Sequence, residues 1–208
     1  MADKPFAPAC ERNREPILAV LRERFAGCRH VLELGSGTGQ HAVHFAAAMS
    51  WLRWQCTDRA EHLPGIRAWL DEADLDNTPP PLALDVSDAT WPRAPTGSGR
   101  FDAVFSANTL HIMGWAGVEA FFRGVGQSLE PGGGMLVVYG PFNYGGGYTS
   151  GSNRDFDAWL KARDPRSAIR DFEAVDALAR GAGLRLLEDV AMPANNRCLV
   201  WQAGPRPL

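Results

Sequence analysis

The sequence predicts an α/β fold built on a doubly wound, mostly parallel, seven-stranded sheet that ends in an antiparallel hairpin. Short apolar runs alternate with segments of helical spacing along most of the chain, a pattern typical of parallel sheets covered by helices. A glycine-rich loop, 35–39, follows the first apolar run. The last two apolar runs, 184–190 and 197–202, are joined by only six residues, too few for a helical crossover, so we expect them to pair antiparallel.

The individual elements follow from apolar spacing and from glycine and proline positions. The first helix is expected over 15–26, with Pro16 in its first turn, where no intrahelical donor is lost. The expected parallel strands cover 30–34, 53–57, 82–86, 101–106 and 135–139. The expected later helices cover 40–49, 63–73, 118–129, 154–162 and 172–182. The stretch 140–152 is rich in Gly, Tyr, Ser and Asn without apolar periodicity, so we expect a loop there.

Length and composition indicate one globular domain over 1–208. The chain has 208 residues, of which 45% are hydrophobic and 22% charged, enough for one buried core but short for two. Within this domain we expect 1–27 to form an N-terminal helix or lid and 140–172 a substrate-side loop and helix. With 21 basic and 24 acidic residues, the net charge is −3. That balance predicts neither nucleic acid nor a membrane as partner.

The positions of the cysteines and histidines, and the first residues of the chain, indicate which class of protein this is. The four cysteines form no Cys-x-x-Cys pair, and the five histidines show no metal-ligand spacing, so we expect no disulfide framework and no metal site. His41 and His44 lie three apart without a nearby third ligand. The first residues lack a signal peptide, and no apolar run has the length of a membrane span. We therefore expect a soluble cytoplasmic protein.

An acid followed by a glycine loop is the sharpest feature of the sequence. Glu33 precedes Gly35, Gly37 and Gly39 in a G-x-G-x-G pattern, which lets the backbone turn tightly and approach a ligand. Dinucleotide sites use G-x-G-x-x-G instead. A carboxylate is poorly matched to a pyrophosphate but suits a ligand that carries an ammonium group. Asp58 follows the second strand about 20 residues beyond the loop, where a carboxylate can accept hydrogen bonds from ribose hydroxyls, as it also does in NAD sites.

Other strand ends carry polar residues as well. Asp85 ends the third expected strand, and Asn108 and His111 follow the fourth. Because the carboxyl ends of parallel strands line one crevice, Asn108 and His111 are expected near a bound ligand. With an unperturbed pKa of about 6.5, His111 can act as a general base. The alternatives are that Asp58 and Asp85 only cap a helix or turn and that His111 is packed beneath the following helix.

Three segments resemble motifs of class I S-adenosylmethionine-dependent methyltransferases. They are Glu33 to Gly39 for motif I, Phe101 to Ile112 for motif IV and Leu129 to Gly134 for the L-x-P-G-G motif before the fifth strand. The resemblance implies a Rossmann-like fold, S-adenosylmethionine as cofactor and S-adenosylhomocysteine as product. It implies that Ser36, the loop glycines and Asn108 contact the cofactor, and that the Asp85 side chain and the Val86 N–H read the adenine edge.

Further segments resemble the methyltransferase-like protein 26 family, long described as a domain of unknown function. They are Glu11 to Leu18, Ser36 to Ala42, Ala107 to Ile112, Gly140 to Phe142 and Pro193 to Asn196. This resemblance spans nearly the whole chain but implies no substrate. The Asn-Pro-Pro-Tyr signature of many amino-methylating enzymes is absent, which, with the small net charge, favours a small-molecule acceptor.

Polar residues outside the cofactor motifs are the acceptor-side candidates. The catalytic candidates are His111, Tyr144 and Tyr148, and the substrate-binding candidates are Arg12, Asn13, Asn143, Asn195 and Asn196. Arg12 and Asn13 fit a solvated helix cap equally well, and Asn195 and Asn196 fit a hairpin turn.

The sequence thus predicts an enzyme that transfers a methyl group to an oxygen, sulfur or nitrogen atom of a small molecule by in-line displacement. The main alternative is a catalytically silent S-adenosylmethionine-binding regulatory or partner protein. A nicotinamide-dependent reductase is disfavoured by the glycine spacing and by Glu33. The acceptor and the oligomeric state stay open.

Overall fold

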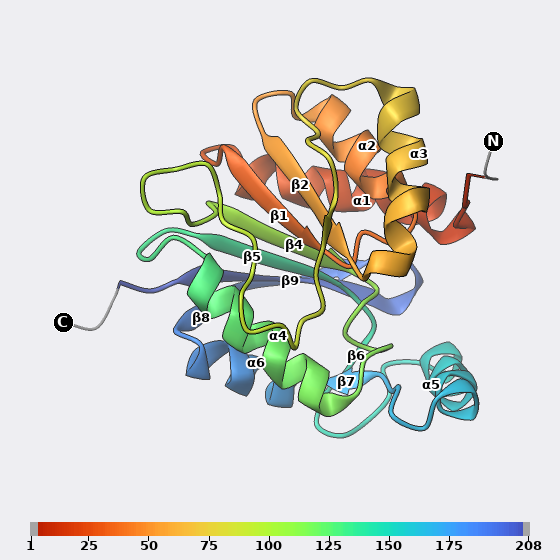
Figure 1. Ribbon diagram of the computed structural model, residues 1–208. Coiled ribbons are helices and arrows are strands. Elements are labelled where there is room, and N and C mark those ends of the chain that lie inside the picture. The colour runs from red at the N-terminus through yellow and green to blue at the C-terminus, as the bar shows by residue number, and fades with distance from the viewer. Residues whose placement is uncertain (1–3, 206–208) are drawn as a thin grey trace.

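A seven-stranded sheet in the order β3-β2-β1-β4-β5-β9-β8 forms the centre of the computed structural model, which describes residues 4–205 (Figure 1). The parallel strands are β1 (His30–Leu34), β2 (Arg53–Asp58), β3 (Leu82–Ala83), β4 (Ala103–Ala107) and β5 (Met135–Gly140). Strand β9 (Asn196–Ala203) runs antiparallel to both β5 and β8 (Leu184–Met192). The predicted fold class, including the terminal hairpin, is confirmed.

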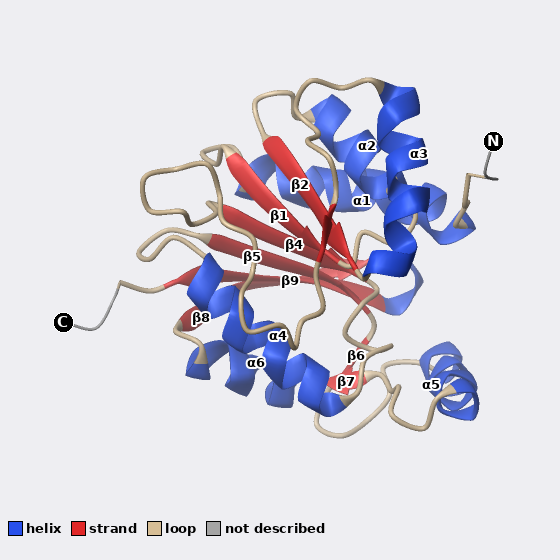
Figure 2. Ribbon diagram, viewed as in Figure 1, coloured by secondary structure: helices blue, strands red, loops and turns tan. Residues whose placement is uncertain are grey.

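Helices cover both faces of the sheet (Figure 2). One layer contains α1 (Pro8–Arg24), α2 (Gln40–Ala48) and α3 (Leu63–Ala73), and the other contains α4 (Trp115–Ser128) and α6 (Phe172–Gly181). Each layer has its own buried cluster, with Trp54 on the first side and Trp201 on the second, both 0% exposed. Alternate residues of β5 enter opposite clusters, as expected for a strand covered on both faces.

Among residues 4–205, four short elements and one helix lie outside this sandwich. The 3-10 turns are η1 (Ala60–His62) and η2 (Pro193–Asn195). After β5, strand β6 (Phe142–Asn143) pairs in parallel with β7 (Arg170–Asp171), and α5 (Gly151–Arg163) lies between them in sequence. No helix within 4–205 is long and apolar enough to cross a membrane.

The first helix begins earlier than the apolar pattern predicts. The expected start at Glu15 was wrong, because α1 begins at Pro8, and Pro16 lies in its interior. Proline there removes the N–H that would bond the carbonyl one turn back. Burial of Ile17, Leu18 and Leu21 against the sheet holds the helix together across this position.

Several other boundaries differ from the prediction by one to three residues, for example that of α4, which begins at Trp115 instead of residue 118. Strand β3 ends at Ala83 instead of continuing to Val86, because Asp85 accepts hydrogen bonds from the N–H and the hydroxyl of Ser87 and turns the chain. The stretch 140–152 is not loop throughout, since it contains β6 and the first residues of α5. Two residues of strand are too short to produce a periodicity that a sequence pattern could reveal.

Candidate cofactor and active site

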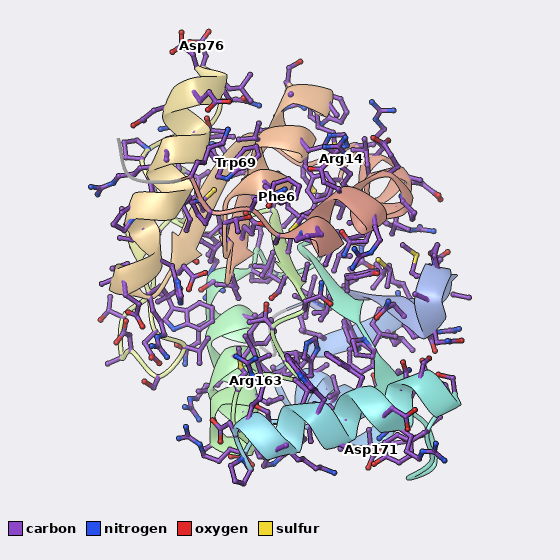
Figure 3. All side chains as sticks on the ribbon, turned by 90° about the vertical axis from the view of Figure 1, so that its right-hand side faces the viewer. Phe6, Arg14, Trp69, Asp76, Arg163 and Asp171 are labelled. Atoms are coloured by element: carbon purple, nitrogen blue, oxygen red, sulfur yellow. The ribbon has the colours of Figure 1, made fainter. Side chains whose placement is uncertain are left out.

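The strands β1, β2, β4 and β5 end at one edge of the sheet, and Figure 3 looks onto that edge. The layer of α1 to α3 lies above the edge in this view, and α5 lies below it. The loop from Gly35 to Gly39 joins β1 to α2 at the edge, with left-handed φ angles of 72°, 59° and 91° at its three glycines. A Cβ at Gly35 would lie 2.8 Å from Thr109 Cγ2, whereas at Gly37 nothing lies within 4 Å. The loop therefore presents bare backbone to open space at Gly37.

Glu33 lies beneath this loop with only 2% of its surface exposed. Its Oε2 accepts hydrogen bonds from the Ser36 hydroxyl at 2.9 Å and the Trp54 indole N–H at 3.0 Å, with the Cys56 thiol at 3.7 Å. Among residues 4–205, no donor forms a hydrogen bond to its Oε1. Burial raises the pKa of Glu33 to about 6, although these hydrogen bonds oppose the rise. Oε1 is thus available to a cationic group.

Asp58 ties the glycine loop to the end of β2. Its Oδ2 accepts from the Gly37 N–H at 2.7 Å, and its Oδ1 accepts from the Arg59 N–H at 2.8 Å. Each carboxylate oxygen retains a further lone pair for a ligand hydroxyl. Asp85 differs, because its Oδ1 accepts hydrogen bonds from the N–H and the hydroxyl of Ser87, and the residue is exposed. These contacts match the turn alternative for Asp85.

Asn108 and His111 lie in the loop between β4 and α4. Asn108 has a left-handed φ of 57°, uncommon for a residue with a side chain and frequent at functional sites. A Cβ placed on Gly140, at the end of β5, would lie 3.7 Å from His111 Nδ1 and 4.0 Å from Asn108 Oδ1. These two polar atoms therefore converge on one point beyond β5.

The His111 imidazole is 6% exposed and packs edge-on against the ring of Phe156, with 5.4 Å between centroids. Burial, and secondly the positive charge of Arg170, lowers the pKa of His111 to about 4. The imidazole is consequently neutral near pH 7 and can accept a proton.

The two tyrosines predicted as catalytic have their hydroxyl groups occupied. Tyr144 donates to Asp189 at 2.7 Å, and Tyr148 donates to Asp157 at 2.7 Å. Burial and the Asp189 carboxylate raise the pKa of Tyr144, and the Asp157 carboxylate raises that of Tyr148. These contacts favour a role in fixing the 144–148 loop.

The substrate-binding candidates are spread over separate elements. Asn13, on α1, is 8% exposed and bonds His41 Nε2 through Oδ1 at 2.7 Å, while Arg12 beside it is exposed. Asn143 is buried, and its Oδ1 has no hydrogen-bond partner among the described residues. Asn195 and Asn196 lie in the hairpin turn, where their amides bond Ser152 and the carbonyls of the turn. The turn alternative therefore accounts for the last two.

Three residues that support the site are absent from the sequence prediction. The Gln40 amide oxygen accepts from the Ala7 N–H at 2.6 Å, and its NH2 donates to Glu11 at 3.1 Å, which docks the N-terminal segment on the start of α2. Trp54 holds Glu33, and Arg170 holds the loop of His111. A tryptophan inside a buried strand does signal a need for an N–H partner, but Gln40 and Arg170 carry no such signal because their partners lie far away in sequence.

Among residues 4–205, no three His, Cys, Asp or Glu side chains are grouped to hold a metal ion.

The model of a family described as "Protein of unknown function (DUF938)" matches residues 4–203. The chain belongs to the DUF938 family. That description names no activity.

This DUF938 chain is similar in fold to solved methyltransferases. The S-adenosylmethionine-dependent methyltransferase SibL is 23% identical, with a TM-score of 0.78, over 95% of this chain and 56% of SibL. The mitomycin 7-O-methyltransferase MmcR is 19% identical, with a TM-score of 0.80, over 94% of this chain and 54% of MmcR.

The O-methyltransferase NcsB1 from neocarzinostatin biosynthesis was solved with S-adenosylmethionine and 2-hydroxy-5-methyl naphthoic acid. It is 16% identical, with a TM-score of 0.75, over 94% of this chain and 54% of NcsB1. The DUF938 chain thus spans a little over half the length of these proteins. At such identities the likeness shows that it has the Rossmann-like methyltransferase fold.

Proposed function

We propose that this protein transfers a methyl group from S-adenosylmethionine to a small-molecule acceptor. The observation that carries the proposal is the convergence of Asn108 Oδ1 and His111 Nδ1 beyond β5, at the strand edge that also holds the glycine loop. Ligands of parallel α/β sheets bind at this edge. The neighbour solved with S-adenosylmethionine and a naphthoic acid supports the cofactor and the acceptor class. The segments resembling the methyltransferase-like protein 26 family support the same activity, and the four free thiols support a cytoplasmic location.

The residues present fit this cofactor. Gly37 leaves room for a ligand against bare backbone, Glu33 Oε1 can accept from the ammonium of the methionine part, and Asp58 can accept from ribose hydroxyls. When bound, the cofactor would supply an electrophilic methyl group. The protein then has to hold the acceptor in line and keep water away, and alignment of this kind is worth on the order of 7–11 kcal/mol of barrier.

His111 and Asn108 would act on the acceptor. An acceptor hydroxyl has to lose its proton as the new bond forms, and neutral His111 Nδ1 can take it. A base with a pKa of about 4 is adequate, because a hydroxyl oxygen that carries a partly formed bond to methyl is a strong acid. Asn108 Oδ1, close to the same point, can orient the acceptor by accepting a hydrogen bond from a second donor group of the acceptor.

Calorimetry tests the cofactor part of the proposal. S-adenosylmethionine should bind the wild type, and the affinity should fall at least about tenfold in Asp58→Ala, which loses the ribose contact. Asp76→Ala is the control, because Asp76 lies at the far end of α3, away from the site (Figure 3). No binding by the wild type, or equal binding by Asp58→Ala, would refute the assignment.

Label transfer tests the chemistry. Methyl-labelled S-adenosylmethionine, incubated with the protein and a metabolite extract, should pass label to a small molecule, and His111→Ala should reduce the rate by about 100-fold or more. Binding without transfer would instead support the cofactor-binding regulatory protein. A thermal shift with NAD or NADP but none with S-adenosylmethionine would support the reductase.

A further inference from the structure

The loop that carries His111 is held by one short segment, 167–170, which follows α5 in the sequence. Four successive backbone carbonyls, from Leu110 to Met113, accept hydrogen bonds from the segment 167–170. The Ala168 N–H donates to the His111 carbonyl at 3.0 Å, and the Ser167 hydroxyl donates to the Ile112 carbonyl at 3.0 Å. The remaining two carbonyls bond the side chain of Arg170.

Arg170 binds this loop with a charged group. Its Nε donates to the Leu110 carbonyl at 3.1 Å, and its Nη2 donates to the carbonyls of Met113 and Arg166. The side chain is only 9% exposed, and no carboxylate among residues 4–205 lies within ion-pair distance of it. Burying a guanidinium without a counter-ion is costly, so this arginine is not explained as one half of an ion pair.

Three backbone carbonyls, with the Trp115 ring 6.0 Å from the guanidinium carbon, are an unusual set of partners for a buried charge. A guanidinium offers five N–H donors in a fixed fork, and here two of its nitrogens reach three carbonyls, two of them on either side of His111. A lysine has a single nitrogen and cannot reproduce that spread. The Arg170 side chain, which lies outside the 110–113 loop, therefore fixes the path of the backbone on both sides of His111.

We propose that Arg170 is the positioning residue of His111, holding the 110–113 loop on β7 so that the imidazole meets the end of β5. This inference rests on the proposed function for its chemical meaning. Arg170 does not touch the point where Asn108 and His111 converge and acts only through the loop.

The charge of Arg170 adds an electrostatic effect to the mechanical one. It is the charged group that lowers the pKa of His111, after burial. Phe156, Gly140 and Asn108 pack around the imidazole without charge. Asp157 of α5 is the nearby carboxylate, and it is already engaged by Lys161 at 2.6 Å and by Tyr148. Removal of the arginine charge should therefore make His111 easier to protonate.

Two measurements that need neither cofactor nor substrate test this proposal. NMR titration of the His111 ring gives its proton affinity. Hydrogen exchange of the Ala168 amide reports how stably this amide stays bonded to the His111 carbonyl, and so how firmly the segment 167–170 holds the loop. In Arg170→Gln we expect a proton affinity raised on the order of tenfold and faster exchange. In Arg170→Lys, which keeps the charge but loses the fork, we expect faster exchange with little change in proton affinity.

Arg166→Gln is the matched control. It removes a neighbouring positive charge whose side chain is 79% exposed and pairs with Asp164, so both quantities should stay at wild-type values. Unchanged proton affinity in Arg170→Gln, or unchanged exchange in Arg170→Lys, overturns the proposal. If Arg170→Gln does not fold, the exchange measurement on Arg170→Lys decides alone. Failure of the wild type to bind S-adenosylmethionine would refute the proposed function and leave both of these results standing.

Discussion

Replacing Glu33 with glutamine should stabilise the protein without cofactor and weaken cofactor binding. Burial raises the pKa of Glu33 from 4.5 to about 6, so the folded state holds this proton more tightly than the unfolded chain. The stability contribution of such a group is complete below the unfolded pKa and falls as pH rises through the folded one. The raised pKa corresponds to a loss of about 2 kcal/mol in the free energy of unfolding as the pH goes from below 4.5 to well above 6.

Glutamine is neutral and of the same size, and its amide oxygen can accept from Ser36 and Trp54 in place of Oε2. In Glu33→Gln that pH-dependent loss should vanish. Urea unfolding near pH 5 and near pH 8 measures this loss. The free energy of unfolding is determined for both proteins at both pH values, and the change with pH is compared between them. We expect Glu33→Gln to gain about 1 kcal/mol over the wild type between these pH values, because pH 5 lies above the unfolded pKa of 4.5 and part of the loss has already occurred there. Other titrating groups cancel, because both proteins share them.

Glu119→Gln, an exposed substitution on α4, serves as control and should show no such difference. Calorimetry on the same proteins should show a weaker affinity for S-adenosylmethionine in Glu33→Gln, since the carboxylate that faces the ammonium is gone. An equal pH dependence in wild type and Glu33→Gln would refute the electrostatic argument. Equal cofactor affinity would refute the role assigned to Oε1.

Four further substitutions separate packing from function. Gly37→Ala should cost about 1–2 kcal/mol of stability for its left-handed φ and abolish cofactor binding, whereas Gly35→Ala should cost more in urea unfolding, because its Cβ would lie 2.8 Å from a neighbouring side chain. Pro16→Ala should stabilise the protein by up to about 3 kcal/mol in the same assay, since it restores a helix donor; a loss of stability would contradict this. Tyr148→Phe should keep label transfer near the wild-type rate, because its hydroxyl serves a buried carboxylate, and a large loss would return Tyr148 to the catalytic candidates.

The arrangement of Glu33, the glycine loop and Asp58 could be predicted from the sequence because its determinants are local. Glu33 and the glycines are contiguous, and Asp58 ends the next strand, so strand order alone brings them together. The parallel pairing of β1 with β2 places Glu33 opposite Cys56, two residues from Asp58. Here a pattern within about 25 residues carries the whole geometry, and no distant contact has to be known.

The surroundings of His111 and Asn108 could be predicted only in part. His111 and Asn108 follow from the rule that strand ends line the crevice, but the sequence separation of 60 residues between Arg170 and the Leu110 carbonyl leaves no local pattern to find. The two tyrosines show the same limit. The partners of the Tyr144 and Tyr148 hydroxyls, Asp189 and Asp157, become visible only when the chain is folded.

In the proposed cofactor site, Glu33 would also link binding to pH. Without cofactor, a buried carboxylate with three donors on one oxygen and none on the other is held at a cost, which a cationic ligand at Oε1 would offset. A proton and the cofactor then compete for the same carboxylate. As pH falls below about 6, protonated Glu33 no longer attracts the ammonium, so the affinity for S-adenosylmethionine should fall by up to about tenfold for each further pH unit. Calorimetry near pH 5 and pH 8 measures this, and Glu33→Gln should bind equally weakly at both. A wild-type affinity that does not change between them would mean that the ammonium is held elsewhere.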